Sequence, residues 1–437
     1  MDRKSIAEQI FLAGVAGVLP DQLIRSQVKL VNNILSVAGH TYDLTSIKNI
    51  YVIGAGKASA LMAKEIEFLL GERITKGHIV VKYGHGCDLK FITITEAGHP
   101  LPDANGVAAA GQILEMAQSA DEHDLVICLI SGGASSLLAD FPEGSGLEDL
   151  QLANELLVKS GAGIKEINTV RKHLSHIKGG QLARAIYPAK AVSLILSDVV
   201  GDPLEVIASG PTSYDNSTFA DAYAVVQEYL PGNKFPKTMM RHLQDGIAGW
   251  LPETPKAGDK VFDNIKNLII GSNGMALTAA AAKAQALGFT TYVITDALEE
   301  DYTEVAEFIL TTIENFRNYH KEKPICLLFG GEPTVKVTGS GLGGRNQHLA
   351  LYCALKLQGT KGITLLCAGT DGSDGPTDAA GAVVDGETAA KARAAGIDLQ
   401  QYLNNADSYH FFKQAGGHII TGSTKTNVMD MMVVLIE

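Results

Sequence analysis

Short apolar runs that end in glycine alternate with alanine- or leucine-rich stretches along most of this chain. The run at 49–53 ends in GAGKAS and leads into ALMAKEIEFLL. Further runs of this kind are HIVVKYGHG, FITITEAGHP, DLVICLISGGASS, AVSLILSDVVGDP, NLIIGSNG, TTYVITDA, PICLLFGGE and GITLLCAGTDG. Continuous apolar runs are typical of strands buried on both faces, and the stretches between them are typical of crossover helices. The pattern predicts an α/β protein with largely parallel sheets, each covered by helices on both sides, in which a three-layer architecture is built twice.

The first 40 residues and the middle of the chain depart from this alternation. Helices are predicted at 5–18 and 22–37, and the capping-box spacing of Ser5 and Glu8 favours a first amphipathic helix over a signal peptide. Between about 231 and 265 the alternation breaks, with four of the 14 prolines. We therefore predict a Rossmann-like N-terminal domain over 1–245 and a smaller α/β domain over 246–437, with an interdomain cleft.

Composition and charge exclude several classes of function. The formal net charge is −12, and no run of Lys or Arg supplies a face for nucleic acid or an anionic membrane. No segment approaches the roughly 20 apolar residues of a membrane span. The five cysteines form no C-x-x-C pair, which favours reduced thiols in a cytoplasmic protein. A small anion, held by a few local cations, remains a possible ligand.

GAGKAS contains the first candidate for such a cation. Lys57 follows Gly54 and Gly56 at the predicted start of a helix, where the dipole disfavours a cation unless an anion lies between them. The stretch is not a dinucleotide fingerprint, because Ser59 stands where the third glycine belongs, and it is not a Walker A loop. The alternative is a surface lysine after a tight turn.

LISGGASS is a second glycine turn after a predicted strand. Ser131, Gly132, Gly133 and Ser135 offer hydroxyls and consecutive amides to phosphate oxygens. The order of residues is not that of a nucleophile elbow, so no hydrolytic serine is assigned. Helix capping is the alternative function of these hydroxyls.

GLGGRNQHLAL places a second cation at the start of a helix. Arg345 follows Gly343 and Gly344, and the dipole argument applies to it as it does to Lys57. Two such cations in opposite halves of the chain suggest that the cleft clamps an anion. The alternative for the following Asn346 and Gln347 is capping of this helix.

Aspartates follow two of the predicted strands. Asp198 stands in SDVVGDP, where it could hold Mg²⁺ or accept a hydroxyl proton, and GTDGSDGPTDAAG at 369–381 carries three more. That stretch fails as a calcium loop, because Pro376 interrupts it and Ala382 stands at the twelfth position. It is either a solvated turn with helix caps or part of a ligand site.

Taken together, these motifs resemble the glycerate 2-kinases of the MOFRL type. The resemblance runs from about residue 50 to 385 and rests on GAGKAS, TEAGHPLPD, ISGGASSLL, VRKHLSHIKGGQLA, SDVVGDPLEVIASGPT, GGEPTV, GGRNQHLAL and GTDGSDGPTDAAGAVVD. It implies transfer of a phosphoryl group from ATP, with Mg²⁺, to the 2-hydroxyl of D-glycerate. It also implies that Lys57 and Arg345 contact the phosphoryl group or the carboxylate, and that Asp198 lies near the attacking hydroxyl.

The loop GTDGSDGPTDAAG shares a predicted sheet end with the Arg345 helix, which narrows the remaining assignments. Asp198 and Asp371 are the predicted metal ligands, Asp371 and Asp374 are expected to face the cleft, and Asp378, after Pro376, is expected to be a cap. Lesser candidates are Arg171, Lys172 and Lys178, whose alternative is a solvated helix face. The end of the chain departs from the family, which usually reads TGPTGTNVND where this chain has TGSTKTNVMD.

Two rival functions and one question of assembly stay open. A hydroxypyruvate reductase would need a nicotinamide site, for which the first glycine turn lacks the third glycine and a clear ribose-binding carboxylate. A non-catalytic sugar-phosphate module would not explain two cations together with a carboxylate cluster. A homodimer is possible.

Overall fold

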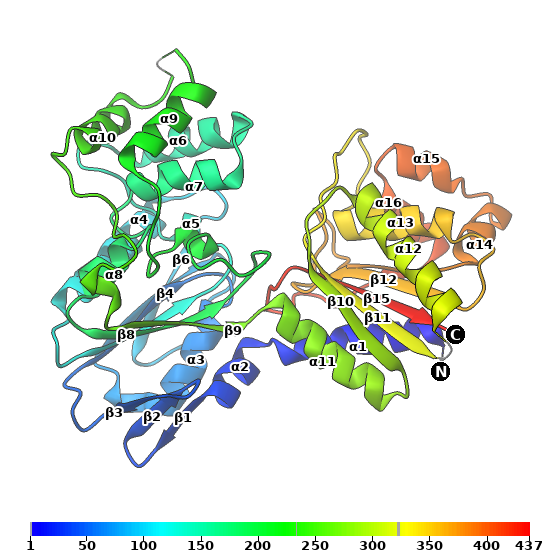
Figure 1. Cartoon of the computed structure of the whole chain (residues 1–437), viewed down its shortest axis with the longest axis horizontal. Helices are drawn as coiled ribbons and strands as arrows, with labels where there is room; N and C mark the ends of the chain where they lie inside the picture. The colour runs from blue at the N-terminus through cyan, green and yellow to red at the C-terminus, as the bar shows by residue number, and fades with distance from the viewer. Residues whose placement is uncertain (1, 233, 321–323) are drawn as a thin grey trace. The chain divides into compact units, whose positions relative to one another are not determined.

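The structure is a computed structural model that describes residues 2–232, 234–320 and 324–437 (Figure 1). The chain divides into two compact units, each with one six-stranded sheet. The parallel-sheet unit comprises Leu23–Ser197 and Asp202–Ile270, and the mixed-sheet unit comprises Met1–Gln22, Asp198–Gly201 and Gly271–Glu437. Both are three-layer α/β structures, which confirms the predicted fold class.

The parallel-sheet unit has the strand order β6-β5-β4-β7-β8-β9. Parallel pairing joins β4 to β5 and β7, β5 to β6, and β7 to β8, so each of these apolar runs forms the strand that its pattern predicts. The order reverses between β4 and β7, which makes the carboxyl ends of these two strands the topological switch point of the sheet. The strands are β4 (Ile50–Ala55), β5 (Lys76–Lys82), β6 (Ile92–Ala97), β7 (Leu125–Ile130), β8 (Lys190–Leu196) and β9 (Ile265–Gly271).

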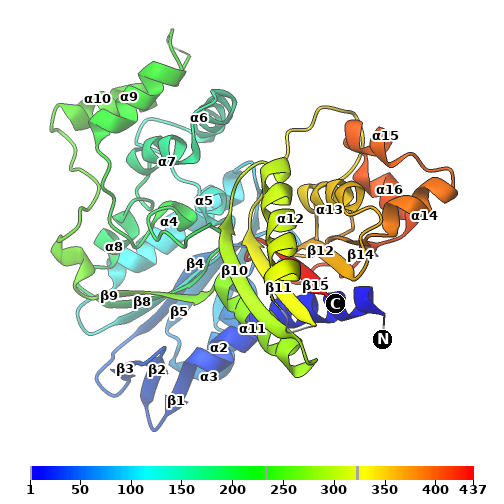
Figure 2. The same cartoon turned by 45° about the vertical axis from the view of Figure 1, so that its right-hand side comes forward.

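Helices cover both faces of this sheet, and a separate group of helices lies beyond one of these layers (Figure 2). The sheet is covered by α3 (Ser59–Leu70) on one face and by α4 (Ala104–Ser119), α5 (Ala134–Leu137) and α8 (Gln181–Ile186) on the other (Figure 1). The separate group shares a core around Leu157, Val170 and Met239. It contains α6 (Leu147–Lys159), α7 (Ile164–His173), α9 (Phe219–Tyr229) and α10 (Lys237–Ile247).

The predicted helix at 22–37 is wrong in its second half. The structure has α1 (Arg3–Gly17) and α2 (Pro20–Gln27), followed by the antiparallel strands β1 (Val28–Val31), β2 (Ile34–Val37) and β3 (His40–Asp43). Asn32 and Asn33 form the turn between β1 and β2 with φ of 50° and 68°. Asparagine tolerates the left-handed region better than most residues, and two such residues in succession favour a tight hairpin over a helix.

The second sheet is mixed, so the prediction of a largely parallel sheet is wrong for this unit. Its order is β10-β11-β15-β12-β13-β14, and only β10 and β11 pair in parallel. The C-terminal run DMMVVLI forms β15 in the middle of the sheet, antiparallel to both neighbours. The strands are β10 (Thr290–Leu298), β11 (Ile325–Gly331), β12 (Ile363–Gly369), β13 (Gly381–Asp385), β14 (His418–Ile419) and β15 (Asp430–Ile436).

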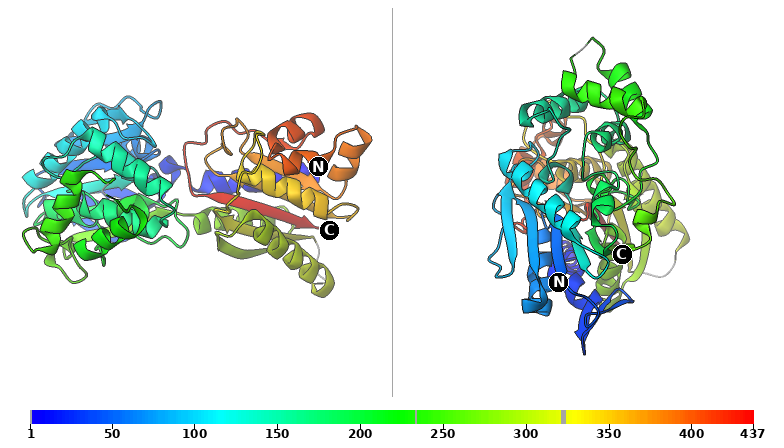
Figure 3. Two further views of the ribbon diagram at one scale, coloured as in Figure 1. Left: turned by 90° about the horizontal axis from the view of Figure 1, so that it is seen from above. Right: turned by 90° about the vertical axis from the view of Figure 1, so that its left-hand side faces the viewer.

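The mixed-sheet unit includes the first helix of the chain. Figure 3 shows α1 beside β15, and α1 also packs on α11 (Asn273–Ala286) on the same face of the sheet. The opposite face carries α12 (Tyr302–Tyr319), α13 (Arg345–Lys356), α14 (Thr388–Ala394), α15 (Leu399–Asn404) and α16 (Ser408–Ala415). Three short 3₁₀ turns complete the structure at Gly71–Arg73, Ile207–Ser209 and Lys260–Phe262.

The parallel-sheet unit extends to Ile270, so the boundary with the mixed-sheet unit lies later than the predicted boundary between residues 245 and 246. Residues 246–270 belong to the parallel-sheet unit, because they lead into β9, which is the sixth strand of that sheet. The break in the alternating pattern therefore marks a connection between α10 and β9 within one unit.

Candidate functional site

The two glycine turns at the switch point of the parallel sheet are bonded directly to each other. The amide of Lys57 donates to the carbonyl of Gly132 at 2.9 Å, and the amide of Ala58 donates to Oγ of Ser131 at 3.0 Å. Ser59 Oγ lies 3.1 Å from the same Ser131 oxygen. The turns after β4 and β7 therefore form one structure, as expected for a composite site at this edge.

The glycines of the first turn allow this close approach. A Cβ at Gly54 would lie 2.0 Å from the carbonyl oxygen of Leu129, and one at Gly56 would lie 2.1 Å from Oγ of Ser131. Gly56 also has a φ of +133°, a backbone conformation that residues with a side chain rarely adopt. The predicted ligand-binding glycines of GAGKAS thus have a packing reason of their own, because any side chain would push the turns apart.

Lys57 and His99 lie together over the second turn. A Cβ at Gly133 would be 2.8 Å from Nε2 of His99 and 3.6 Å from Cγ of Lys57. Burial, together with the nearby charges of Lys57, Lys82 and His85, lowers the pKa of His99 to about 4. Among the described residues no carboxylate lies within 4 Å of the Lys57 ammonium group. In this corner of the molecule, Lys57 therefore lies beside other basic groups and, within the described part of the chain, forms no ion pair.

The backbone of the second turn adds donors to this corner. Within the described part of the chain, the amide groups of Gly132 and Gly133 have no hydrogen-bond acceptor. Successive free amides beside a cation are a common arrangement for binding anionic oxygens. The predicted hydroxyl donors point elsewhere, since Ser131 joins the two turns and Ser135 Oγ lies 2.9 Å from Oγ of Ser209.

Sequence reasoning assigned no role to His99 or Ser209. Ser209 is buried, has a φ of +61°, and donates to Oδ1 of Asn168 at 3.2 Å. Both residues stand in stretches that support the family resemblance, TEAGHPLPD and SDVVGDPLEVIASGPT. Those motifs were the available signal, but the position of each side chain depends on contacts with residues far away in the sequence.

The basic residues of VRKHLSHIKGG do not form a solvated helix face. Lys172 is buried 3.2 Å from Asp215, and Lys178 is buried 3.2 Å from Asp140. The ammonium group of Lys178 also donates to the carbonyl of Leu138 at 2.6 Å. Buried charges are costly unless they are paired, and the carboxylates of Asp215 and Asp140 supply the partners of these two lysines. The two lysines therefore have a structural role within the protein.

Arg345 in the mixed-sheet unit is bound by two carboxylates of the chain itself. Its Nε and Nη2 donate to Asp430 at 2.6 and 3.1 Å, and its Nη1 donates to Glu332 at 2.6 Å. Burial disfavours the charge of Arg345, but these two carboxylates more than offset it and raise its pKa. The anion that the dipole argument required near Arg345 is thus present in the protein.

Burial also shifts the pKa of Asp430, the carboxylate that accepts two hydrogen bonds from Arg345. Asp430 is almost fully buried at the start of β15, and this burial raises its pKa to about 6 against the opposing effect of Arg345. Glu332, by contrast, keeps 45% of its side chain exposed. The two carboxylates therefore differ, because one is a buried structural partner and the other is accessible to solvent.

Asp374 is a buried helix cap, which contradicts the expectation that it faces a cleft. Its carboxylate accepts hydrogen bonds from the amides of Asn346 and Gln347 at 3.0 and 2.9 Å, in the first turn of α13. Burial raises its pKa, and these hydrogen bonds act in the opposite direction. A Cβ at Gly344 would lie 2.2 Å from Cγ of Asp374, and one at Gly343 would lie 2.2 Å from Oγ of Ser408, so both predicted ligand-binding glycines pack against side chains.

The other two aspartates of GTDGSDGPTDAAG are more exposed. Asp371 is half-buried, and its Oδ1 accepts hydrogen bonds from the amide and hydroxyl of Ser373 at 3.0 and 3.1 Å. Asp378 is exposed and accepts a hydrogen bond from the hydroxyl of Tyr409 at 2.8 Å. Asp371 and Asp378 are therefore both accessible to solvent, whereas Asp374 is buried.

The predicted metal ligands do not form a preformed cage. Asp198 is half-buried just after β8 and belongs to the mixed-sheet unit, as Asp371 does. Over the described ranges, no three His, Cys, Asp or Glu side chains converge in a way that would hold a metal. Mg²⁺ often binds through one or two carboxylates plus substrate phosphates, and a site of that kind needs no such cage.

The divergent stretch TGSTKTNVMD leads into β15 and contains two residues in left-handed conformations. Lys425 has a φ of +64° and Met429 a φ of +69°. These positions correspond to glycine and asparagine in the family pattern. Lys425 and Met429 therefore place side chains where the backbone conformation favours glycine or asparagine.

Comparisons with known proteins agree along the whole chain. Residues 6–244 match a family described as a domain of unknown function, DUF4147, and residues 325–430 match the MOFRL family. A D-glycerate 2-kinase from Thermotoga maritima is 41% identical over 436 residues, covering 99% of this chain and 98% of that protein. A crystal structure of glycerate kinase from the same organism has a TM-score of 0.88 at 40% identity and covers 99% of each chain.

One relative has a different name. A protein of Agrobacterium vitis that is provisionally named a hydroxypyruvate reductase is 42% identical over 389 residues, covering 88% of this chain and 86% of that protein.

None of the helices in the described ranges is long and apolar enough to cross a membrane.

Proposed function

Because this chain belongs to the glycerate kinase family in which a DUF4147 region precedes a MOFRL region, we propose that it phosphorylates D-glycerate at the 2-hydroxyl, with ATP as the donor. The observation that carries the proposal is the group of basic residues at the switch point. Lys57, the free amides of Gly132 and Gly133, and His99 lie together in one corner, and among the described residues no carboxylate lies within 4 Å of the Lys57 ammonium group. Such a corner suits the phosphates of a nucleotide.

The transfer forms a bond between the 2-oxygen of glycerate and the γ-phosphorus, breaks the bond from that phosphorus to the β–γ bridging oxygen, and releases ADP. Little covalent chemistry is required of the protein, so positioning and charge supply most of the catalysis. We assign to Lys57 the neutralisation of charge on the phosphoryl oxygens. To Asp198 we assign the role of accepting the proton of the 2-hydroxyl.

Arg345 takes a different part in this proposal from Lys57. Its guanidinium group would reach a substrate carboxylate only by releasing Glu332, because Asp430 is buried and holds the other side of the fork. Removing Arg345 would also leave Asp430 buried and unpaired, and such a change typically costs about 3–5 kcal/mol. Loss of activity in Arg345→Ala therefore needs a stability measurement beside it.

Mg²⁺ would accompany the nucleotide, and Asp371 is the carboxylate that fits it best. It is half-buried, and its Oδ1 is engaged with the adjacent Ser373, whereas Asp374 is committed to a helix terminus. When bound, Mg²⁺ would supply positive charge to the phosphate oxygens. Asp198 is the second candidate ligand.

Turnover with defined substrates tests the proposed reaction. The protein is mixed with D-glycerate, ATP and Mg²⁺, and the product is examined by phosphorus NMR with proton coupling. Phosphorus on the 2-oxygen couples to one carbon-bound proton, whereas phosphorus on the 3-oxygen couples to two. A 3-phosphate would overturn the regiochemistry. Oxidation of NADH by hydroxypyruvate without ADP formation would instead support the reductase.

We call the group of Lys57, His99, Gly132 and Gly133 the anion corner. Substitution of Lys57 is the sharpest test of its proposed role. We expect Lys57→Ala to lower turnover by at least roughly a hundredfold, as loss of a preorganised electrostatic group does in other enzymes. The matched control is Lys64→Ala, which removes an exposed lysine of α3, the helix that follows the turn of Lys57. Equal turnover in the two variants, each checked for an unchanged unfolding midpoint, would contradict the role of Lys57.

A further inference from the structure

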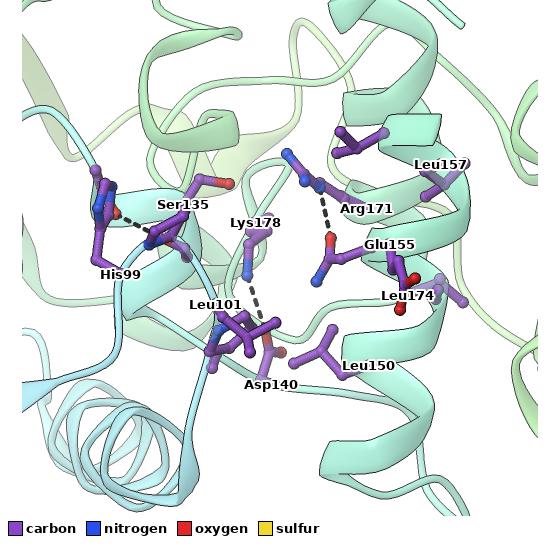
Figure 4. Close-up of a pocket in the computed structure, with 18 of the residues that line it drawn as sticks. His99, Leu101, Ser135, Asp140, Leu150, Glu155, Leu157, Arg171, Leu174 and Lys178 are labelled. Atoms are coloured by element: carbon purple, nitrogen blue, oxygen red, sulfur yellow. Dashed lines mark hydrogen bonds and ion pairs between the residues drawn. The ribbon is translucent and has the colours of Figure 1, made fainter. Parts of the chain in front are cut away.

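A pocket of about 550 Å³ opens beside the anion corner, within the parallel-sheet unit. Figure 4 shows His99 and Ser135 of α5 on one side of it, and Leu150 and Leu157 of α6 with Arg171 of α7 on the other. Its walls are largely apolar, and Leu101, Leu150, Leu157 and Leu174 contribute to them. A pocket of this size and lining is typical of sites that enclose most of a small organic ligand.

Arg171 supplies free donors to this apolar pocket. Its Nε donates to Oδ1 of Asn154 at 2.8 Å, and among the described residues its two Nη groups have no acceptor. Burial lowers the pKa of Arg171. Lys178 in the same pocket differs, because Asp140 and the carbonyl of Leu138 already bind it. Arg171 is thus a half-buried cation whose donors remain available to a ligand.

We propose that this pocket binds the adenosine part of the phosphoryl donor, so that its phosphates reach the corner formed by Lys57, His99 and Gly133. The proposal rests on the proposed kinase function and adds to it the location of the nucleoside. The apolar walls enclose the base and ribose carbons. Arg171 donates to acceptor nitrogens of the adenine ring, which carries such acceptors on its edges.

The position of the pocket relative to the anion corner supports this direction of binding. Gly133 and His99 line the pocket, and Lys57 lies against the same glycine. A ligand that fills the pocket and carries an anionic chain at one end would therefore reach Lys57 without leaving the surface of this unit. A nucleotide has this shape, with an uncharged base at one end and phosphates at the other.

D-Glycerate is the poorer occupant of this pocket. Each of its three carbons carries oxygen, so leucine walls would remove water from polar groups without replacing their hydrogen bonds. It is also far smaller than the ligands that pockets of several hundred Å³ enclose. The phosphoryl donor, rather than the acceptor, has the apolar surface that the walls can cover.

Calorimetric titration with ADP and with pyrophosphate tests the proposal. Leu101→Gln and Val158→Gln change two exposed side chains that line the pocket, and Leu152→Gln changes an exposed leucine of α6 that does not line it. We expect each pocket variant to weaken ADP binding about tenfold, because apolar contact with the base is lost. Pyrophosphate, which lacks a nucleoside, should bind within about twofold of the wild type, and Leu152→Gln should change neither ligand.

The outcomes separate this proposal from the kinase function itself. Unchanged ADP binding in both pocket variants, equal weakening of ADP and pyrophosphate, or no ADP binding by the wild type would overturn the nucleoside pocket. Selective weakening of ADP would support it even if no phosphoglycerate forms, since the titration needs no turnover. Arg171→Met, with an unfolding midpoint measured beside it, should also weaken ADP more than pyrophosphate.

Discussion

At the scale of single residues, the environment of a side chain decides what its charge can do. Lys57 and Arg345 both follow glycines close to the start of a helix, and sequence reasoning treats them alike. In the structure Arg345 is held by Asp430 and Glu332, whereas Lys57 lies beside other basic groups. Lys57 is therefore the cation that an external anion would balance.

His99 should report the binding of an anion at this corner. Burial and three neighbouring basic groups, Lys57, Lys82 and His85, hold its pKa near 4, so its ring is neutral at pH 7. A bound anion favours the protonated ring, and we expect saturating pyrophosphate to raise the pKa of His99. Proton NMR titration of the ring measures it, with assignment from His99→Gln. An unchanged or lower pKa in the presence of bound pyrophosphate would argue against an anion at this position.

Lys425 should cost the protein stability through its backbone. It is exposed and has a φ of +64°, which costs a residue with a side chain about 1–2 kcal/mol. Glycine removes this strain but loses more freedom on folding, so Lys425→Gly should stabilise by about 0.5–1 kcal/mol. Lys425→Ala, which removes the charge and keeps the strain, is the control. Urea unfolding distinguishes them, and equal stability of the two variants would show that φ is not the cause.

At the scale of elements, the first turn of α13 is stabilised by a carboxylate from a loop 27 residues later. Asp374 accepts from the amides of Asn346 and Gln347 and from the side chain of Gln347. The loop GTDGSDGPTDAAG therefore has a structural function in addition to any contact with a ligand. Aspartate is favoured here because free amides at a helix start are stabilised by a negative charge.

Loss of this cap should destabilise the mixed-sheet unit. Asp374→Ala leaves buried amides without an acceptor, and we expect a loss of about 2–3 kcal/mol in the free energy of unfolding. Asp378→Ala, in the same loop, removes an exposed carboxylate that accepts a hydrogen bond from Tyr409 and should cost less than about 0.5 kcal/mol. Urea unfolding measures both changes. A cost for Asp374→Ala as small as that for Asp378→Ala would show that the cap contributes little.

At the scale of the whole molecule, the first helix of the chain belongs with its last strand. α1 packs on α11 and against β15, and Thr426 donates from Oγ1 to the carbonyl of Val18 at 2.7 Å. Gly17 permits the closest approach, because a Cβ there would lie 2.4 Å from Cβ of Ala279. The mixed-sheet unit consequently combines the first helix of the chain with its C-terminal part, in addition to the short segment Asp198–Gly201.

Two helical glycines should respond with opposite signs to the same substitution. Gly17→Ala introduces a clash and should destabilise by about 1–3 kcal/mol, whereas Gly111→Ala in α4 meets no atom within 4 Å and should stabilise by up to about 1 kcal/mol. Urea unfolding gives both values. Hydrogen exchange should show lower protection of α11 in Gly17→Ala alone, and unchanged protection there would contradict the packing role of Gly17.

The sequence by itself determined the α/β class, most of the strands of the two large sheets and the glycine turns that follow β4 and β7. Apolar runs and glycine turns are local signals, because they can be recognised from neighbouring residues in the sequence without knowing which distant residues they contact. They also placed Lys57, Ser131 and Gly133 in the correct turns after β4 and β7.

Only the tertiary structure decided which distant strands, helices and side chains contact each other. It placed β15 in the middle of an antiparallel arrangement, joined α1 to the end of the chain, gave Arg345 its carboxylates and made Asp374 a helix cap. Each of these depends on which distant residues meet, and neither the hydrophobic pattern nor the residue type carries that information. A charge near a helix start predicts that an opposite charge is needed, but only the fold shows whether the protein or a ligand provides it.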